Sequence, residues 1–128
     1  MQTLIDRFIT EEDIRNSVNT VYIFGGNLEG WGTAGQAKIA LQFVKTGRSF
    51  AIPTKRAPCT DDECYFADRE DEIIAVRRAF AKIRQLRRDG KEIVFFPGIG
   101  EGMAELSTRS PAIYGMIRGF ISSFECEA

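Results

Sequence analysis

Residues 21–40, VYIFGGNLEGWGTAGQAKIA, decide the expected fold, because a buried strand runs through glycines into a helix. The run TVYIF at residues 20–24 is β-branched and aromatic, which is typical of a strand buried on both faces of a sheet. After the glycines, apolar residues repeat at helical spacing and predict a helix over about residues 33–44, stopping at Gly47. The bare backbone between strand and helix raises the question of what approaches it.

The rest of the chain continues this alternation. SFAIP at residues 49–53 and EIVFF at residues 92–96 predict two more buried strands. Three more helices are expected: one over about residues 11–17, a long one that ends at Gly90, and one that begins at about Pro111. The residues that indicate them, by capping or by apolar spacing, are Thr10 and Ile14, then Ile73, Val76, Phe80 and Ile83, then Ile113, Phe120 and Phe124. The alternation predicts an α/β fold, a three-layer α/β/α sandwich with a mixed, largely parallel sheet.

Length and charge limit the function. The chain of 128 residues fits one domain, residues 1–128. Its 17 Lys and Arg against 18 Asp and Glu give a net charge of -1, which provides no global field to attract nucleic acid or an anionic membrane. No apolar run has the length of a membrane span, and the first residues are acidic where a secretory signal is basic and apolar. We therefore expect a cytoplasmic protein.

The absence of histidine excludes Ser-His-Asp and Cys-His nucleophile systems and His-ligated zinc. Cys59, Cys64 and Cys126 are an odd number of cysteines in a chain without an export signal, which predicts free thiols. The first two lack the spacing of zinc ligands. We expect neither a metal nor a cofactor.

A second glycine-rich turn, PGIGEGMAEL at residues 97–106, follows the third expected strand. In a parallel sheet both turns emerge at the same edge, where ligands bind beyond the carboxyl ends of the strands. Backbone N–H groups of such turns can hold a phosphate without any formal charge. For either turn alone, a purely structural role is equally compatible with the sequence, and neither turn matches a known nucleotide fingerprint.

Several of these segments resemble the macro domain, the ADP-ribose-binding fold. Asp13 and Ile14 precede Asn27 by the interval found in that family, GTAGQAKIA resembles its glycine loop and helix, and residues 97–102 match its P-x-I-G-x-G loop. A closer resemblance, to short bacterial and phage proteins of unknown function, rests on FGGNL, AGQA, IPTKRAP, YFAD and GIGEG. These resemblances imply a macro-domain-like fold and a bacterial or phage protein in the bacterial or host cytoplasm.

The resemblance and the glycine turns together define the expected site. Its ligand-binding residues are Asp13, Gly26, Asn27, Trp31, Gly32, Thr33, Ala34, Gly35, Gln36, Thr54, Lys55, Arg56, Tyr65, Phe66, Gly98, Ile99, Gly100, Gly102 and Met103. Lys55 and Arg56 suit a phosphate, although exposed basic pairs are commonly only solvated. Tyr65 and Phe66 either form a lid or anchor a long loop to the core.

The candidate catalytic residues are Asn27, Asp68 and Glu101. Asn27 would orient a ribose, while capping of its own turn explains it almost as well. Asp68 or Glu101 would transfer protons. We therefore expect a domain that binds, and in an enzymatic version hydrolyses, a small phosphorylated nucleotide such as ADP-ribose or an NAD-derived molecule. The alternative is a non-catalytic protein-interaction module whose glycine turns are structural.

Overall fold

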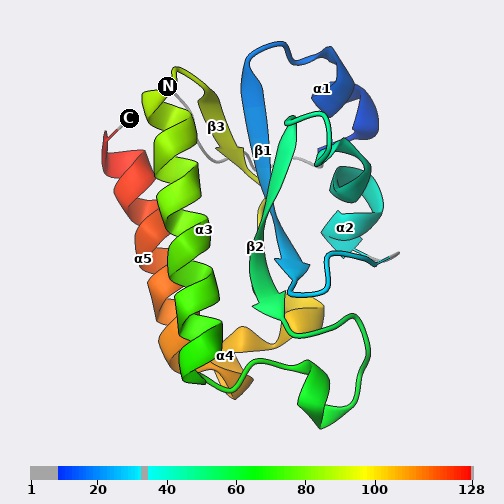
Figure 1. Cartoon of the computed structure of the whole chain (residues 1–128), viewed down its shortest axis with the longest axis vertical. Helices are drawn as coiled ribbons and strands as arrows, with labels where there is room; N and C mark the ends of the chain where they lie inside the picture. The colour runs from blue at the N-terminus through cyan, green and yellow to red at the C-terminus, as the bar shows by residue number, and fades with distance from the viewer. Residues whose placement is uncertain (1–8, 33–34, 128) are drawn as a thin grey trace.

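The structure, a computed structural model, describes residues 9–32 and 35–127. Strands and helices alternate along the chain, with short 3₁₀ turns between some of them (Figure 1). The elements are α1 (Glu11–Asn16), β1 (Thr20–Asn27), α2 (Gly35–Ala40), η1 (Leu41–Phe43), β2 (Ser49–Lys55), η2 (Asp62–Cys64), α3 (Glu70–Arg88), β3 (Glu92–Phe95), η3 (Gly102–Ala104), α4 (Leu106–Arg109) and α5 (Pro111–Glu127).

The three strands form one parallel sheet in the order β2-β1-β3. Tyr22 of β1 pairs with Ser49 of β2 and with Val94 of β3, so β1 is the central strand, as its apolar sequence predicts. The α/β class is confirmed. The sheet of the described residues is parallel throughout rather than mixed, and its antiparallel contact is an isolated bridge between Lys55 and Tyr65.

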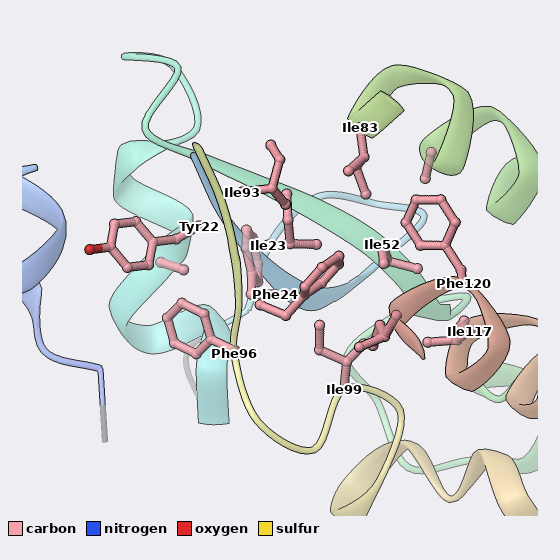
Figure 2. Packing of buried hydrophobic residues seen from close by; sticks show 14 of the residues in the cluster. Tyr22, Ile23, Phe24, Ile52, Ile83, Ile93, Phe96, Ile99, Ile117 and Phe120 are labelled. Carbon is pink, nitrogen blue, oxygen red and sulfur yellow. The ribbon is translucent and has the colours of Figure 1, made fainter. Parts of the chain in front are cut away.

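Helices cover both faces of the sheet. Figure 1 shows α1 and α2 on one side of the strands and α3 and α5 on the other. The buried side chains between these layers form one hydrophobic core, part of which Figure 2 shows around Phe24 and Ile52. Phe80 of α3 stacks on Phe120 of α5, with ring centroids 4.0 Å apart, and aromatic contacts of this kind add to the burial of apolar area.

The strands extend further than their apolar runs predict. β1 continues through Gly25 and Gly26 to Asn27, and β2 continues past Pro53 to Lys55. Pro53 is tolerated because β2 lies at the edge of the sheet, where a missing N–H need not break a ladder. As a result, both strands carry their polar ends to the same edge.

Cys59 and Cys64 form a disulfide, so the expectation of free thiols is wrong for this pair. The pairing comes from local folding, which neither the expected compartment nor the odd number of cysteines reveals. The loop after β2 turns back so that the N–H groups of Arg56 and Ala57 both donate to the carbonyl of Cys64, and the two cysteine Cα atoms lie 5.7 Å apart.

None of the helices in the described part of the chain combines the length and the apolar character needed to cross a membrane. The same part of the chain contains no group of three or more acidic or cysteine side chains placed to hold a metal ion.

Candidate functional site

A cleft of about 630 Å³ opens at the carboxyl ends of the strands. The chain leaves β1 toward α2 on one face of the sheet and leaves β3 toward α5 on the other, so the cleft lies where the connections diverge (Figure 1). It is lined by Gly25, Gly26, Asn27, Trp31, Gly32, Gln36, Ala37, Thr54, Lys55, Pro58, Thr60, Tyr65, Gly98, Gly100, Glu101, Gly102, Met103, Ala104 and Glu105.

Gln36 joins the two glycine-rich turns at the base of the cleft. Its Oε1 accepts a hydrogen bond from the N–H of Gly25 at 2.8 Å, and its Nε2 donates to the carbonyl of Pro97 at 2.6 Å. One side chain of α2 therefore holds the end of β1 and the loop after β3 at a set spacing. Gln36, an expected ligand-binding residue, therefore lines the cleft, and its side-chain amide holds the two turns in position.

The loop after β3 presents backbone to the cleft. Gly98, Gly100 and Gly102 all have positive φ, at 72°, 86° and 64°, a conformation that side chains rarely adopt. Gly98 and Gly102 have open space where a Cβ would stand, while a Cβ on Gly100 would meet Leu106 at 2.6 Å. Within residues 9–32 and 35–127, the N–H groups of Gly98 and Gly100 donate to no protein acceptor.

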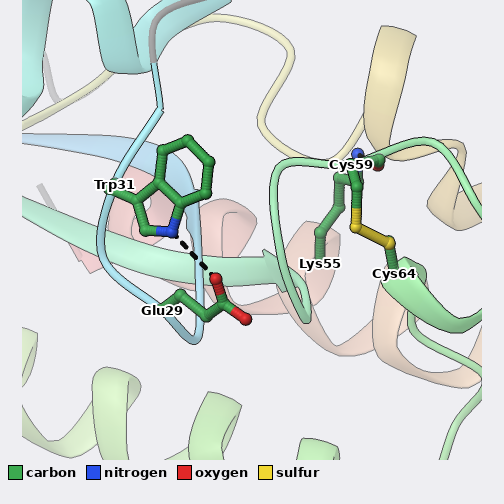
Figure 3. The surroundings of a disulfide bond; sticks show 5 residues. All are labelled: Glu29, Trp31, Lys55, Cys59 and Cys64. Atoms are coloured by element: carbon green, nitrogen blue, oxygen red, sulfur yellow. Dashed lines mark hydrogen bonds between the residues drawn. A yellow bond between two sulfur atoms is a disulfide. The ribbon is translucent and has the colours of Figure 1, made fainter.

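The end of β2 brings a cation and an aromatic ring to the cleft. Lys55, which Figure 3 shows beside Cys59, donates from Nζ to the carbonyl of that residue at 2.6 Å. The same Nζ lies 4.5 Å from the centre of the Tyr65 ring. The guanidinium of Arg109 lies 3.8 Å from the same ring centre. Burial lowers the pKa of Lys55, with a further lowering by Arg109 that Glu105 opposes. Tyr65 is 6% exposed, and its hydroxyl makes no hydrogen bond to the described residues.

Two exposed apolar side chains line the opening of the cleft. Trp31 is 57% exposed and Met103 is 61% exposed. Trp31 follows β1 in the chain, and its Nε1 donates to Glu29 at 2.8 Å (Figure 3). Trp31, one of the expected ligand-binding residues, thus lies at the edge of the cleft. Flat or polarisable side chains in such a position suit an aromatic base.

Two carboxylates, Glu101 and Glu105, also line the cleft. Glu101 pairs with Arg118 at 3.5 Å, and Glu105 accepts from Arg109 Nε at 3.0 Å. Each negative charge thus has a cation beside it, which reduces the repulsion that a phosphate would meet.

Asn27 lines the cleft, but its amide serves its own turn. Its Oδ1 accepts from the N–H groups of Glu29 and Gly30, at 3.0 and 2.9 Å, and its Nδ2 donates to the carbonyl of Trp31 at 2.8 Å. These contacts match the alternative role of Asn27, the capping of its own turn. Thr54 is similar, because its hydroxyl donates to the carbonyl of Gly26 and joins β2 to β1.

Arg56 and Asp68 are not brought to the cleft. Arg56 forms ion pairs with the fully buried Glu72 at 2.6 Å and with Asp71 at 2.8 Å. Asp68 accepts from the Ser110 hydroxyl and from the N–H groups that begin α5, Ala112 and Ile113. Partial burial raises the pKa of Asp68, but these hydrogen bonds outweigh it and leave the pKa below its ordinary value. Both residues therefore stabilise the fold.

The remaining expected ligand residues divide into three groups. Asp13 accepts from the N–H of Thr10 and caps α1. Phe66 and Ile99 are core side chains, each 1% exposed. Gly35 begins α2, and Thr33 and Ala34 lie outside the described residues.

Sequence reasoning missed several residues of the cleft wall: Gly25, Ala37, Pro58, Thr60, Ala104 and Glu105. Gly25 was within the quoted turn and could have been included on that ground. Pro58 and Thr60 enter through the disulfide-closed loop, and Glu105 through its left-handed backbone, φ 52°, neither of which has a sequence signal.

Residues 4–120 match the model of a family described as a family of unknown function (DUF7831). No curated protein matches the chain. No solved structure matches it either.

Proposed function

Because the chain belongs to this family of unknown function, DUF7831, we propose from its own cleft that it binds a small phosphorylated nucleotide, such as ADP-ribose or an NAD-derived molecule. One observation carries the proposal. Gly98 and Gly100, whose N–H groups donate to no acceptor within the described residues, line a cleft at the carboxyl ends of parallel strands, where the connections diverge. We also propose that the fold is a macro-domain-like sandwich.

The loop of Gly98 to Gly102 is the proposed phosphate site. The N–H groups of Gly98 and Gly100 donate to no acceptor among the described residues, and the open space at Gly98 and Gly102 lets an anion approach the backbone. Lys55 supplies the positive charge of the cleft wall that is not already paired with a carboxylate. The ammonium has three N–H donors and uses one on the carbonyl of Cys59, so another can donate to a phosphate and form an ion pair with it.

The base and ribose have separate places in this arrangement. Trp31 and Met103 at the opening suit the face of a base, and the hydroxyl of Tyr65 is available to a sugar or phosphate oxygen.

Binding without hydrolysis is the simpler form of the proposal. Asp68 and the amide of Asn27 are occupied by structural hydrogen bonds, so a hydrolytic version would depend on Glu101 or Glu105. Replacement of Glu101 by Gln, with product formation measured from ADP-ribosylated protein, decides whether any turnover depends on that carboxylate.

Isothermal titration calorimetry with ADP-ribose tests the proposal. We expect saturable binding by the wild-type protein and at least tenfold weaker binding by Lys55→Ala, since a charge-assisted hydrogen bond contributes roughly 1.5–3 kcal/mol. The matched control is Lys38→Ala, which removes an exposed lysine of α2 that does not line the cleft. The fluorescence of Trp31 should change on binding, because this residue lines the opening.

Absence of heat with ADP-ribose and with a panel of mono- and dinucleotides would remove the nucleotide proposal and favour the protein-interaction module. Equal affinity of Lys55→Ala and wild type would remove Lys55 from the phosphate site.

A further inference from the structure

The segment between β2 and α3 forms one wall of the cleft, and a covalent bond closes it. We call residues 56–65 the wall loop. Within it the Cys59–Cys64 disulfide lies beside two backbone hydrogen bonds, from the N–H groups of Arg56 and Ala57 to the carbonyl of Cys64, at 2.9 and 3.4 Å. The wall loop contributes Pro58, Thr60 and Tyr65 to the lining of the cleft.

Both contacts of Lys55 lie at or beside the cysteines of the disulfide. The carbonyl that accepts from Lys55 Nζ belongs to Cys59, and Figure 3 shows Lys55 beside the disulfide. The ring under Lys55 belongs to Tyr65, the residue after Cys64. Lys55 and Tyr65 also form an isolated β-bridge. One contact of this cation therefore lies on a cysteine of the disulfide, and the other lies on the residue next to the second cysteine.

The two sulfur-bearing residues differ in accessibility. Cys64 is 3% exposed and packs into the protein, whereas Cys59 is exposed. An attacking thiolate can therefore reach Cys59 first, and access is one of the factors that set the rate of thiol–disulfide exchange.

We infer that the Cys59–Cys64 pair is a redox switch of the cleft, in which the disulfide keeps the wall loop closed for ligand binding and its reduction weakens binding. The inference rests on the proposed function for its effect on the ligand. It depends on no other cofactor.

The reaction needs a dithiol reductant. One thiolate of the reductant attacks the sulfur of Cys59, the disulfide breaks, and Cys64 leaves as a thiolate that takes up a proton. The second thiol of the reductant then displaces the sulfur of Cys59. The reductant becomes a disulfide, and the cysteine pair gains two electrons and two protons.

Reduction lowers the affinity because it makes the wall loop less ordered before binding, and it removes no contact with the ligand. In the oxidised protein the wall loop is already closed, so binding does not have to order it. In the reduced protein only hydrogen bonds and the contacts of Lys55 and Tyr65 close the loop, and the ligand must supply the remaining order. We expect reduction to weaken binding roughly threefold to tenfold, the range for one side chain that becomes immobilised.

The test uses ADP-ribose calorimetry on the full chain, oxidised or reduced with dithiothreitol. Wild type should bind less tightly when reduced. The double variant Cys59→Ser/Cys64→Ser should bind like the reduced wild type in both conditions. Cys126→Ser, which leaves the pair intact, should respond like wild type and so assigns the effect to the Cys59–Cys64 pair.

A ligand-free measurement accompanies the titration. Hydrogen exchange of the Arg56 and Ala57 amides should be faster after reduction. If ADP-ribose binds equally in both states, the switch is wrong although the proposed function stands. If ADP-ribose binds in neither state, the proposed function is wrong, and the redox switch is then tested by the exchange rates. Faster exchange after reduction supports the switch, and unchanged exchange overturns it.

Discussion

At the scale of single residues, the carboxylate of Glu72 depends on the donors around it. It is fully buried, and it accepts from Arg56 Nε at 2.6 Å, from Arg69 Nη1 at 3.0 Å and from the N–H groups of Ala67 and Arg69. Removal of one partner leaves a buried charge less well satisfied. We predict that Arg56→Ala lowers the free energy of unfolding by about 2 kcal/mol, measured by urea denaturation.

The matched control for this variant is Arg77→Ala, an exposed arginine of α3, which should change stability by no more than about 0.5 kcal/mol. Arg56→Ala should also keep its affinity for ADP-ribose, because Arg56 does not line the cleft. Equal stability of the two variants would mean that Arg69 and the backbone satisfy Glu72 without Arg56.

The lowered pKa of Asp68 leads us to predict that the free energy of unfolding depends on pH. Its folded pKa lies below the ordinary value of 3.8, because hydrogen bonds from Ser110, Ala112 and Ile113 outweigh the effect of burial. A depressed folded pKa stabilises the protein above the unfolded pKa, and this contribution disappears as pH falls through the folded value. Asp68→Asn should therefore cost about 1 kcal/mol at pH 7, by loss of the α5 cap, and less below pH 3.8.

Urea denaturation of both proteins between pH 7 and pH 3 measures this difference. A gap that stays constant over the whole range would contradict the assignment of the effect to ionised Asp68.

At the scale of one element, substitutions in the loop after β3 can distinguish glycines needed for backbone conformation from glycines that contact a ligand. Gly98 and Gly90 both have positive φ and open space around a built Cβ, but only Gly98 lines the cleft. Alanine at either position should cost about 1 kcal/mol of stability, because of the backbone conformation. We predict that Gly98→Ala also weakens ADP-ribose binding, measured well below the melting temperature, while Gly90→Ala does not.

Gly100 is a poorer position for this experiment. A Cβ there would meet Leu106, a fully buried side chain, at 2.6 Å, so Gly100→Val would disturb the core before it blocked a ligand. Normal binding by Gly98→Ala would assign the loop glycines to turn formation alone.

At the scale of the whole molecule, a ligand that binds only the folded state stabilises the domain. At a concentration one hundred times its dissociation constant, ADP-ribose should contribute about 2.7 kcal/mol, which corresponds to a rise of a few degrees in melting temperature for a domain of this size. Differential scanning calorimetry measures the shift. The shift should be smaller for Lys55→Ala at the same ligand concentration, and a shift equal to that of wild type would contradict the role of Lys55.

The sequence by itself determined the alternation of strands and helices, the central position of β1 and the edge at which both glycine turns emerge. Those features follow from the spacing of apolar residues and from glycine chemistry, which are local properties of the chain. Gln36, Lys55 and Trp31 could be placed near the cleft for the same reason.

Only the tertiary structure decided which polar side chains are free to meet a ligand. Arg56 and Asp68 have suitable chemistry for binding, but Glu72 of α3 and the first turn of α5 take up their hydrogen bonds. The disulfide of the wall loop likewise depends on how the chain after β2 folds back. These pairings join residues on different elements, so they depend on packing in three dimensions and leave no periodic pattern in the sequence.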